Sequence, residues 1–219
     1  MMDIPFIIKY LPVFIDAAKL TVVLAAVGIT LSIIIGLLCS IVRYYRIPLL
    51  QNIAFLYIEL SRNTPLMIQL FFLYYGLPRV GIRLESVTCA IVGLTFLGGG
   101  YMAEAFRGGL EAVSKVQVEA GLSLGLNRMQ LVRYIILPQA FAVAVPAISA
   151  NAIFLMKETS VFSIIALADL VYVFKDLIRE GHSTESNLML VCSYLVIILP
   201  VSIFFSVLER RVRRAGISS

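Results

Sequence analysis

Three long stretches of this sequence contain no charged residue. They cover residues 20–42, 134–156 and 186–208, and each is 23 residues long. A helix needs about 20 apolar residues to cross the hydrocarbon core of a bilayer, and a charge at its centre costs roughly 2.5 to 3.5 kcal/mol. These stretches therefore predict membrane-spanning helices. Shorter charge-free stretches at residues 63–78 and 86–103 raise the expected number of spans to five.

Composition supports the same fold class. Of the 219 residues, 60% are hydrophobic and 14% are charged, which is about half the charged fraction of an ordinary soluble domain. The three cysteines, Cys39, Cys89 and Cys192, stand singly in apolar stretches, a pattern that favours packing over a metal site or a disulfide framework. We predict an all-α integral membrane protein.

The positive charges predict an orientation, because cytoplasmic loops carry an excess of Lys and Arg. Five spans place the two termini on opposite sides. With a cytoplasmic C-terminus, that side holds eleven Lys and Arg residues against six outside, with Lys157 near a membrane boundary. We therefore expect the N-terminus outside. We interpret the basic block after the last span as a cytoplasmic flank rather than a nucleic-acid site. It consists of Arg210, Arg211, Arg213 and Arg214.

The loop after the third span carries signals for a short separate helix. Ser114 and Gln117 have the spacing of a capping box, and Gly125 is placed to end the helix that they begin. Asn127 and Gln130 form a second box that begins the next helix. We predict a short cytoplasmic helix over about residues 115–125.

Small residues recur at every fourth position of the first span, which favours close contact with another helix. They are Gly28, Ser32, Gly36 and Ser40.

Two prolines interrupt the fourth span. Pro138 and Pro146 remove hydrogen bonds to the carbonyls of Tyr134 and Ala142, so this helix should bend or open locally. The alternatives are a binding device that exposes carbonyls to a cavity and a simple packing kink.

The same loop resembles a known signature. It begins with Glu119, Ala120 and Gly121, and Gly125 follows after three residues. Nine residues then precede Ile135, and Leu137 and Pro138 complete the motif after one more. This pattern is similar to the EAA loop of permease subunits of ATP-binding-cassette importers. Gly121 departs from it, since a second Ala is usual there, and should weaken the helix by up to about 1 kcal/mol.

The resemblance extends along the chain and narrows the family. Residues 59–78, 99–117 and 157–170 look like permeases for polar amino acids, the group that handles histidine, glutamine, glutamate, arginine, cystine and opines. Asn63 stands where Gly is common, and Glu158 stands where Asp or Asn is usual. Both departures bear on substrate identity.

The resemblance implies a type I importer permease fold in one domain over residues 1–219. The chain would form the translocation path of an amino acid importer, and its EAA loop would transmit the conformational change of the ATPase. The spans expected are about 17–43, 60–78, 85–107, 128–156 and 186–209. The residues implied in coupling to the ATPase are Glu119, Ala120, Gly121, Ser123, Gly125 and Pro138.

The resemblance also implies partners in a bacterial inner membrane. These are a dimer of cytoplasmic ATP-binding subunits, a second permease chain that is identical or homologous, and an extracytoplasmic amino-acid-binding protein. The sequence contains no GxxxxGK[ST] phosphate loop, so we expect no bound cofactor and no enzyme activity in this chain. ATP and Mg should bind to the partner ATPase.

Polar residues at membrane depth are the candidates for the substrate path. Glu104 and Arg107 lie on one helix face, so an internal ion pair is the alternative for Glu104. Thr159 or Ser160 could instead cap the helix that follows. The complete set of candidates is Gln69, Tyr74, Tyr101, Glu104, Asn151, Lys157, Glu158, Thr159 and Ser160.

The sequence fits two other function classes less well, an intramembrane enzyme and a passive channel. An intramembrane enzyme needs acid, base or metal ligands at membrane depth, but His182 is the single histidine and no HExxH motif occurs. We therefore predict no catalytic residue and no metal site. A passive channel would leave the capped cytoplasmic helix without a role.

Overall fold

The computed structural model describes residues 4–179 and 181–217, and all regular structure within these ranges is helical. The predicted all-α class is confirmed. The description does not include the side chains of residues 183 and 213–217. Arg213 and Arg214 of the C-terminal basic block are among them.

Nine α-helices occur in the described residues, and four stretches are long and apolar enough to cross a membrane, namely 4–44, 86–111, 128–165 and 184–212. A shorter apolar helical stretch covers 66–80. The helices are α1 (Ile4–Tyr44), α2 (Leu50–Asn63), α3 (Leu66–Phe71), α4 (Ser86–Glu111), α5 (Lys115–Ser123), α6 (Arg128–Leu131), α7 (Leu137–Glu158), α8 (Leu170–Arg179) and α9 (Ser183–Ile217).

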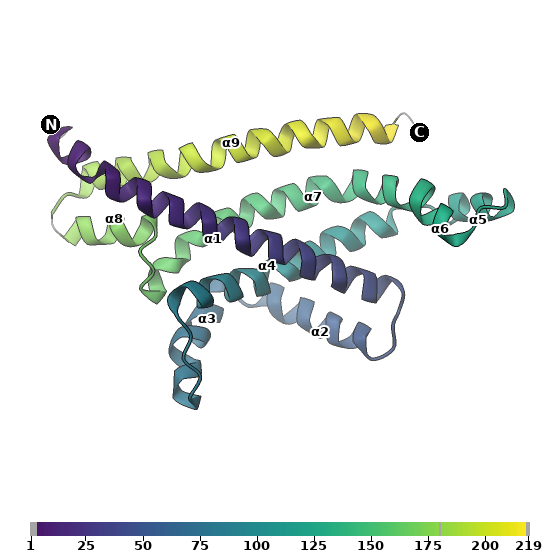
Figure 1. Cartoon of the computed structure of the whole chain (residues 1–219), viewed down its shortest axis with the longest axis horizontal. Coiled ribbons are helices and arrows are strands. Elements are labelled where there is room, and N and C mark those ends of the chain that lie inside the picture. The colour runs from purple at the N-terminus through teal and green to yellow at the C-terminus, as the bar shows by residue number, and fades with distance from the viewer. Residues whose placement is uncertain (1–3, 180, 218–219) are drawn as a thin grey trace.

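The long helices form a bundle whose two ends differ (Figure 1). The N-terminal end of α1 lies beside α8 at one end of the bundle. The C-terminal end of α9 lies at the other, toward which α5 and α6 extend. The first described helix therefore begins at one end of the bundle, and the last one ends at the other.

The second span is a broken helix rather than one continuous segment. We expected it over about residues 60–78, but α2 already begins at Leu50, ends at Asn63, and is followed by α3 from Leu66. Pro65 has no N–H group and disfavours helical backbone in the residue before it. Thr64 accordingly has φ −115° and ψ 123°, and the helix stops there.

A glutamine side chain bridges this break. The Nε2 of Gln69 donates hydrogen bonds to the carbonyl oxygens of Ser61, at 3.2 Å, and Thr64, at 2.9 Å. Both carbonyls lie near the end of α2, where no further helical turn is available to bond them. The buried amide therefore holds α2 and α3 in a set relation across the break.

The predicted small-residue face of α1 is confirmed. All four of its residues are buried. A Cβ atom on Gly36 would lie 2.5 Å from Cβ of Met102, and one on Gly28 would lie 2.7 Å from Cδ2 of Leu94. Lipid tails are as apolar as a helix surface, so close van der Waals packing of this kind drives helix association in a membrane.

Three consecutive glycines on α4 receive side chains from two other helices. A Cβ at Gly98 would meet the Oγ of Ser32 on α1, whereas one at Gly99 or Gly100 would meet the hydroxyl of Tyr57 or Ser61 on α2. The Tyr57 hydroxyl also donates to the Phe96 carbonyl at 2.9 Å. Both α1 and α2 therefore cross α4 at this glycine segment.

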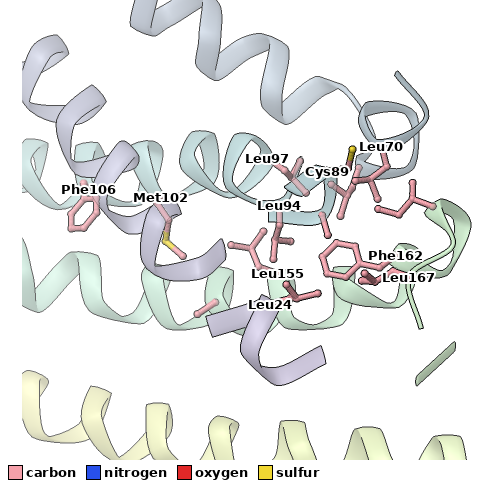
Figure 2. Packing of buried hydrophobic residues seen from close by; sticks show 14 of the residues in the cluster. Leu24, Leu70, Cys89, Leu94, Leu97, Met102, Phe106, Leu155, Phe162 and Leu167 are labelled. Atoms are coloured by element: carbon pink, nitrogen blue, oxygen red, sulfur yellow. The ribbon is translucent and has the colours of Figure 1, made fainter. Parts of the chain in front are cut away.

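Around these crossings, apolar side chains from α1, α3, α4, α7 and the turn after α7 form one cluster (Figure 2). Leu24, Leu94, Leu155 and Phe162 are among its buried members. The cysteines are free: Cys89 belongs to this cluster, Cys39 is half-buried, and Cys192 is exposed.

The two prolines of the fourth span act differently. A wide helical turn over Val132–Ile136 immediately precedes α7, just before Pro138, so the predicted local opening occurs here. At Pro146 the helix continues as part of α7.

The end of α7 corrects one expectation. Neither Thr159 nor Ser160 caps a following helix through its side chain; the Oγ1 of Thr159 instead donates to the Met156 carbonyl at 2.7 Å. The next α-helix, α8, begins later, and its cap is Asp169. The Oδ1 of Asp169 accepts a hydrogen bond from the Tyr172 N–H at 2.9 Å.

This capping aspartate predicts a pH-dependent stability. Asp169 is fully buried, and burial raises the pKa of its carboxyl to about 6 from the ordinary value of 3.8, although the Tyr172 N–H opposes the shift. Between about pH 4 and pH 6 the folded state then binds more protons than the unfolded state, so stability falls as pH rises. Asp169→Asn keeps an acceptor for Tyr172, and should remove this dependence.

We expect Asp169→Asn to be more stable than the parent above pH 7, by about 2 kcal/mol. Melting temperatures in detergent from pH 4 to pH 8 measure the effect. Asp176→Asn, which changes an exposed aspartate on α8, is the matched control and should keep the parental pH profile. Parallel profiles for Asp169→Asn and the parent would contradict the prediction.

Candidate functional site

The predicted short helix after the third span is present as α5. It ends at Leu124, and Gly125 adopts the left-handed conformation with φ +80°. The Gly125 N–H bonds to the Leu122 carbonyl at 2.9 Å, and the Leu126 N–H bonds to the Gly121 carbonyl at 3.1 Å. These two bonds form a Schellman cap, so the predicted capping role of Gly125 is confirmed.

Only one of the two predicted capping boxes forms. Ser114 is the residue before α5, but its side chain makes no capping hydrogen bond, so this part of the prediction is wrong. At the start of α6, Asn127 and Gln130 exchange both hydrogen bonds of the box at 2.9 Å, as predicted.

Gly121 is the buried residue of α5, and its small size has a tertiary cause. A Cβ here would lie 2.5 Å from Cδ2 of Leu131 and 2.7 Å from Cδ1 of Ile135. Both side chains belong to the helical stretch that continues into α7. Gly121 therefore allows α5 to pack closely against the base of α7.

This region also presents exposed apolar side chains. We call this set the α5 patch: Val116, Leu122, Leu124 and Met129, of which Leu124 is 83% exposed. Glu119 on the same helix is also exposed. Exposed apolar clusters bordered by polar residues mark protein interaction surfaces.

A second feature is a cavity of about 400 Å³ beside the break between α2 and α3. Polar groups come from the end of α2, from α4 and from the end of α7. Two of the predicted path residues, Tyr101 and Glu158, line it together. The cavity lining is Arg62, Asn63, Thr64, Pro65, Leu66, Met67, Leu97, Tyr101, Phe154, Glu158 and Val161.

Arg62 is a charged lining residue that was not among the predicted path residues. Its guanidinium lies over the Tyr101 ring at 5.5 Å, and its Nη1 lies 3.9 Å from Oε2 of Glu104. The five-span topology counted Arg62 among the eleven Lys and Arg residues of the cytoplasmic side. The signal that could have found it is its position immediately before the Asn63–Pro65 break.

Glu104 connects three helices. Its Oε1 accepts from Nη1 of Arg43 on α1 at 2.7 Å, and its Oε2 accepts from Nη2 of Arg107 on α4 at 2.6 Å. The ion-pair alternative for Glu104 is thus confirmed, and the network reaches Arg62 on α2. Glu104 does not line the cavity, but it helps to hold the arginine that does.

Asn151 lies next to the cavity without lining it, because its Nδ2 donates to the Tyr101 carbonyl at 3.1 Å. Gln69 bridges the break, as described above. Tyr74 packs edge-on against Tyr75. Lys157 is exposed.

Thr159 is buried and Ser160 is half-buried just beyond Glu158. Neither of them lines the cavity.

Residues 6–214 match the family described as the binding-protein-dependent transport system inner membrane component. The chain belongs to this family. The resemblance found in the EAA loop is therefore confirmed, and the chain is a permease subunit of a transporter.

Several relatives cover nearly the whole permease. The glutamine transport system permease protein GlnP of Escherichia coli K12 is 32% identical over 206 residues, which are 93% of this chain and 94% of GlnP. The probable amino-acid permease protein YxeN of Bacillus subtilis is 34% identical over 219 residues, covering 97% and 95% of the two chains.

Solved structures agree with the fold. A crystal structure of an amino acid ABC transporter with histidines has a chain that is 32% identical, with a TM-score of 0.88 over 96% of this chain and 99% of that one. The permease of the MetNI methionine ABC transporter, at 20% identity, has a TM-score of 0.77. The predicted importer permease fold is confirmed.

Proposed function

We propose that this permease carries a polar amino acid through the cavity beside the α2–α3 break, driven by ATP hydrolysis in a separate subunit. The observation that carries the proposal is a pair of opposite charges, Arg62 and Glu158, lining one membrane cavity. The similar solved transporter contains histidines, and several relatives are named for glutamine.

The cavity chemistry suits a zwitterion. A guanidinium can bind a carboxylate through two hydrogen bonds, and a carboxylate can accept from an ammonium group. Glu158 makes no hydrogen bond or ion pair with the described residues, so its charge is available to a ligand. The volume of about 400 Å³ lies within the usual range of small-molecule sites.

We assign different roles to the candidates in this site. Glu158 and Tyr101 contact the substrate directly together with Arg62. Asn151 and Glu104 act as positioning residues, through the Tyr101 carbonyl and the Arg62 guanidinium respectively. Gln69 keeps the broken helix in the geometry that forms the cavity wall.

Glu158→Gln tests the substrate site. Because a hydrogen bond to a charged group contributes about 1.5 to 3 kcal/mol, the apparent KM for amino acid uptake should rise about tenfold to a hundredfold. Basal ATP hydrolysis should not change. Uptake in proteoliposomes measures KM, and Glu85→Gln, an exposed carboxylate before α4, is the control. A parental KM and parental amino acid preference in Glu158→Gln would rule out this site.

For coupling, we propose that the α5 patch and Glu119 dock onto the ATP-binding subunit, which holds ATP and Mg. Ala120 and Ser123 belong to the same short helix, and Gly121 presses it against Leu131 and Ile135. From there the helical stretch passes Pro138 and reaches Glu158 at the cavity. Displacement of α5 can thus reach the cavity through one helical element.

Gly125→Val tests this transmission. A β-branched residue is strained at φ +80°, so the Schellman cap should fail, and substrate uptake and stimulated ATPase activity should fall together by about tenfold or more. Gly81→Val is the matched control. Gly81 follows the second span, outside α5, and has φ +90°. A Cβ atom at Gly81 or at Gly125 would meet no atom within 4 Å.

Equal coupling defects in the Gly81→Val and Gly125→Val complexes would show that strain alone, and not α5, is responsible. Normal coupling in an assembled Gly125→Val complex would exclude α5 as the transmission element.

We further propose that the α5 end faces the cytoplasm and the N-terminus faces outside, where an amino-acid-binding protein delivers the substrate to a pair of permease chains. The Lys and Arg distribution supports this orientation. Labelling of a cysteine introduced at Gly125 only from the cytoplasmic side would agree with it, and labelling only from outside would overturn it.

A further inference from the structure

Two adjoining hollows lie at the end of α1 that is closer to α5. One is an apolar groove of about 180 Å³ between α1, α4 and α7. The other is a polar pocket of about 600 Å³ between the α1–α2 turn and α5. Tyr44 and Leu110 line both, so an apolar chain in the groove can continue into a polar group in the pocket.

The groove has the depth of one membrane leaflet. It runs along α7 from Ile136 to Ala144, a distance of about 12 Å at 1.5 Å per residue. Half of a hydrocarbon core is about 15 Å. Leu37 and Phe106 line the groove within spans α1 and α4, so a cytoplasmic subunit cannot occupy it without entering the bilayer.

Four charges at or beside the polar pocket are already compensated. Arg43 bonds to Glu104, and Glu111 bonds to Arg107. These pairs leave no charge from Arg43 or Glu111 to attract a further ligand strongly.

The remaining charges of the pocket favour an anion. Arg46 and Lys115 are exposed and form no ion pair with the described residues, and Glu119 is the remaining acidic residue in the lining. The pocket thus has one positive charge in excess, next to an apolar groove. Basic pockets between membrane helices on the cytoplasmic side are suited to anionic lipid headgroups.

We propose that these hollows bind one anionic phospholipid, with an acyl chain in the groove and the phosphate between Arg46 and Lys115. A free phosphate ion would leave the groove empty. The proposal rests on the proposed cytoplasmic orientation of the α5 end, but it concerns a surface away from the substrate cavity and does not depend on the substrate of the permease.

The experiment uses the complete transporter, in nanodiscs of phosphatidylethanolamine and phosphatidylglycerol. After transfer to detergent, native mass spectrometry counts the lipids retained. We expect one phosphatidylglycerol per permease chain, retained in preference to phosphatidylethanolamine. Arg46→Gln/Lys115→Gln should reduce its retention by on the order of tenfold, since each basic residue contributes separately to anionic lipid binding.

Arg79→Gln/Arg83→Gln is the matched control, because it removes two exposed positive charges at the other end of the second span. It should leave retention unchanged. Leu37→Trp, which fills the groove without changing charge, should lower retention of the lipid as well. Added inorganic phosphate should not displace it.

Equal retention of the two lipids by the parent complex would overturn the proposal, as would full retention by Arg46→Gln/Lys115→Gln. Displacement by inorganic phosphate would indicate an anion site without a lipid. If Leu37→Trp separates the two permease chains, the groove is an interface between them and the proposal fails. If the Arg46→Gln/Lys115→Gln complex does not assemble, lipid retention by the Leu37→Trp complex tests the proposal instead. Full retention by that complex would overturn it.

Discussion

Gly36→Ala is expected to destabilise the permease by about 1 to 3 kcal/mol, although alanine is the better helix former. The added methyl would lie 2.5 Å from Cβ of Met102 and 2.7 Å from the backbone nitrogen of Ala103. Backbone atoms cannot rotate away, so α1 must move away from α4. Because α4 also carries Tyr101, this movement should lower transport as well as the melting temperature in detergent.

Gly108→Ala is the matched control for this prediction. Gly108 lies on α4, and a Cβ there meets no atom within 4 Å. The helix propensity of alanine should therefore raise stability by up to about 1 kcal/mol. If Gly36→Ala matched Gly108→Ala in melting temperature, the close α1–α4 contact could not be a determinant of the bundle.

Glu104→Gln is expected to destabilise the permease by about 2 to 4 kcal/mol. The substitution leaves Arg43 and Arg107 without the carboxylate that both of them contact. Uncompensated positive charge within a span is unfavourable. Side chains of this network are 21–37% exposed, which places the expected loss below that of a fully buried pair.

This prediction also has a functional readout. Arg62 should shift when Glu104 loses its charge, so amino acid uptake by the assembled Glu104→Gln complex should show a raised KM. Asp16→Asn removes an exposed pair with Lys19 and should change neither stability nor KM measurably. A parental melting temperature for Glu104→Gln would mean that the arginines find water or lipid phosphate instead.

Local patterns predicted the features that depend on neighbouring residues. The box at Asn127 and Gln130 joins residues three positions apart, and the cap at Gly125 requires one residue that tolerates positive φ. The repeat from Gly28 to Ser40 marks one face of α1 because residues four apart share a face. Each of these predictions needed no knowledge of a distant partner.

The charge criterion found the long spans but not α2. Glu59 and Arg62 interrupt the apolar pattern, so the second span was predicted to begin near residue 60 instead of Leu50. The structure places Arg62 near Glu104 and the Tyr101 ring, more than 35 residues further along the chain. A hydropathy pattern cannot predict that Glu104 and the Tyr101 ring compensate the charge of Arg62.

The substrate candidates likewise could not be sorted without the tertiary structure. Their polarity at membrane depth made nine residues candidates, but it could not show which of them line one cavity. Tertiary structure brought Tyr101 and Glu158 to one cavity, gave Asn151 a bond to the Tyr101 carbonyl, and used Gln69 to bridge a helix break.

Hydropathy and short motifs were sufficient for the class of this protein, its family and the position of the short helix α5, because each rests on residues close together in the chain. The cavity, the Glu104 network and the close approach at Gly121 depend on which helices cross and at what height. Helix crossings are set by the summed packing of side chains from several helices, and no single segment of the sequence contains that information.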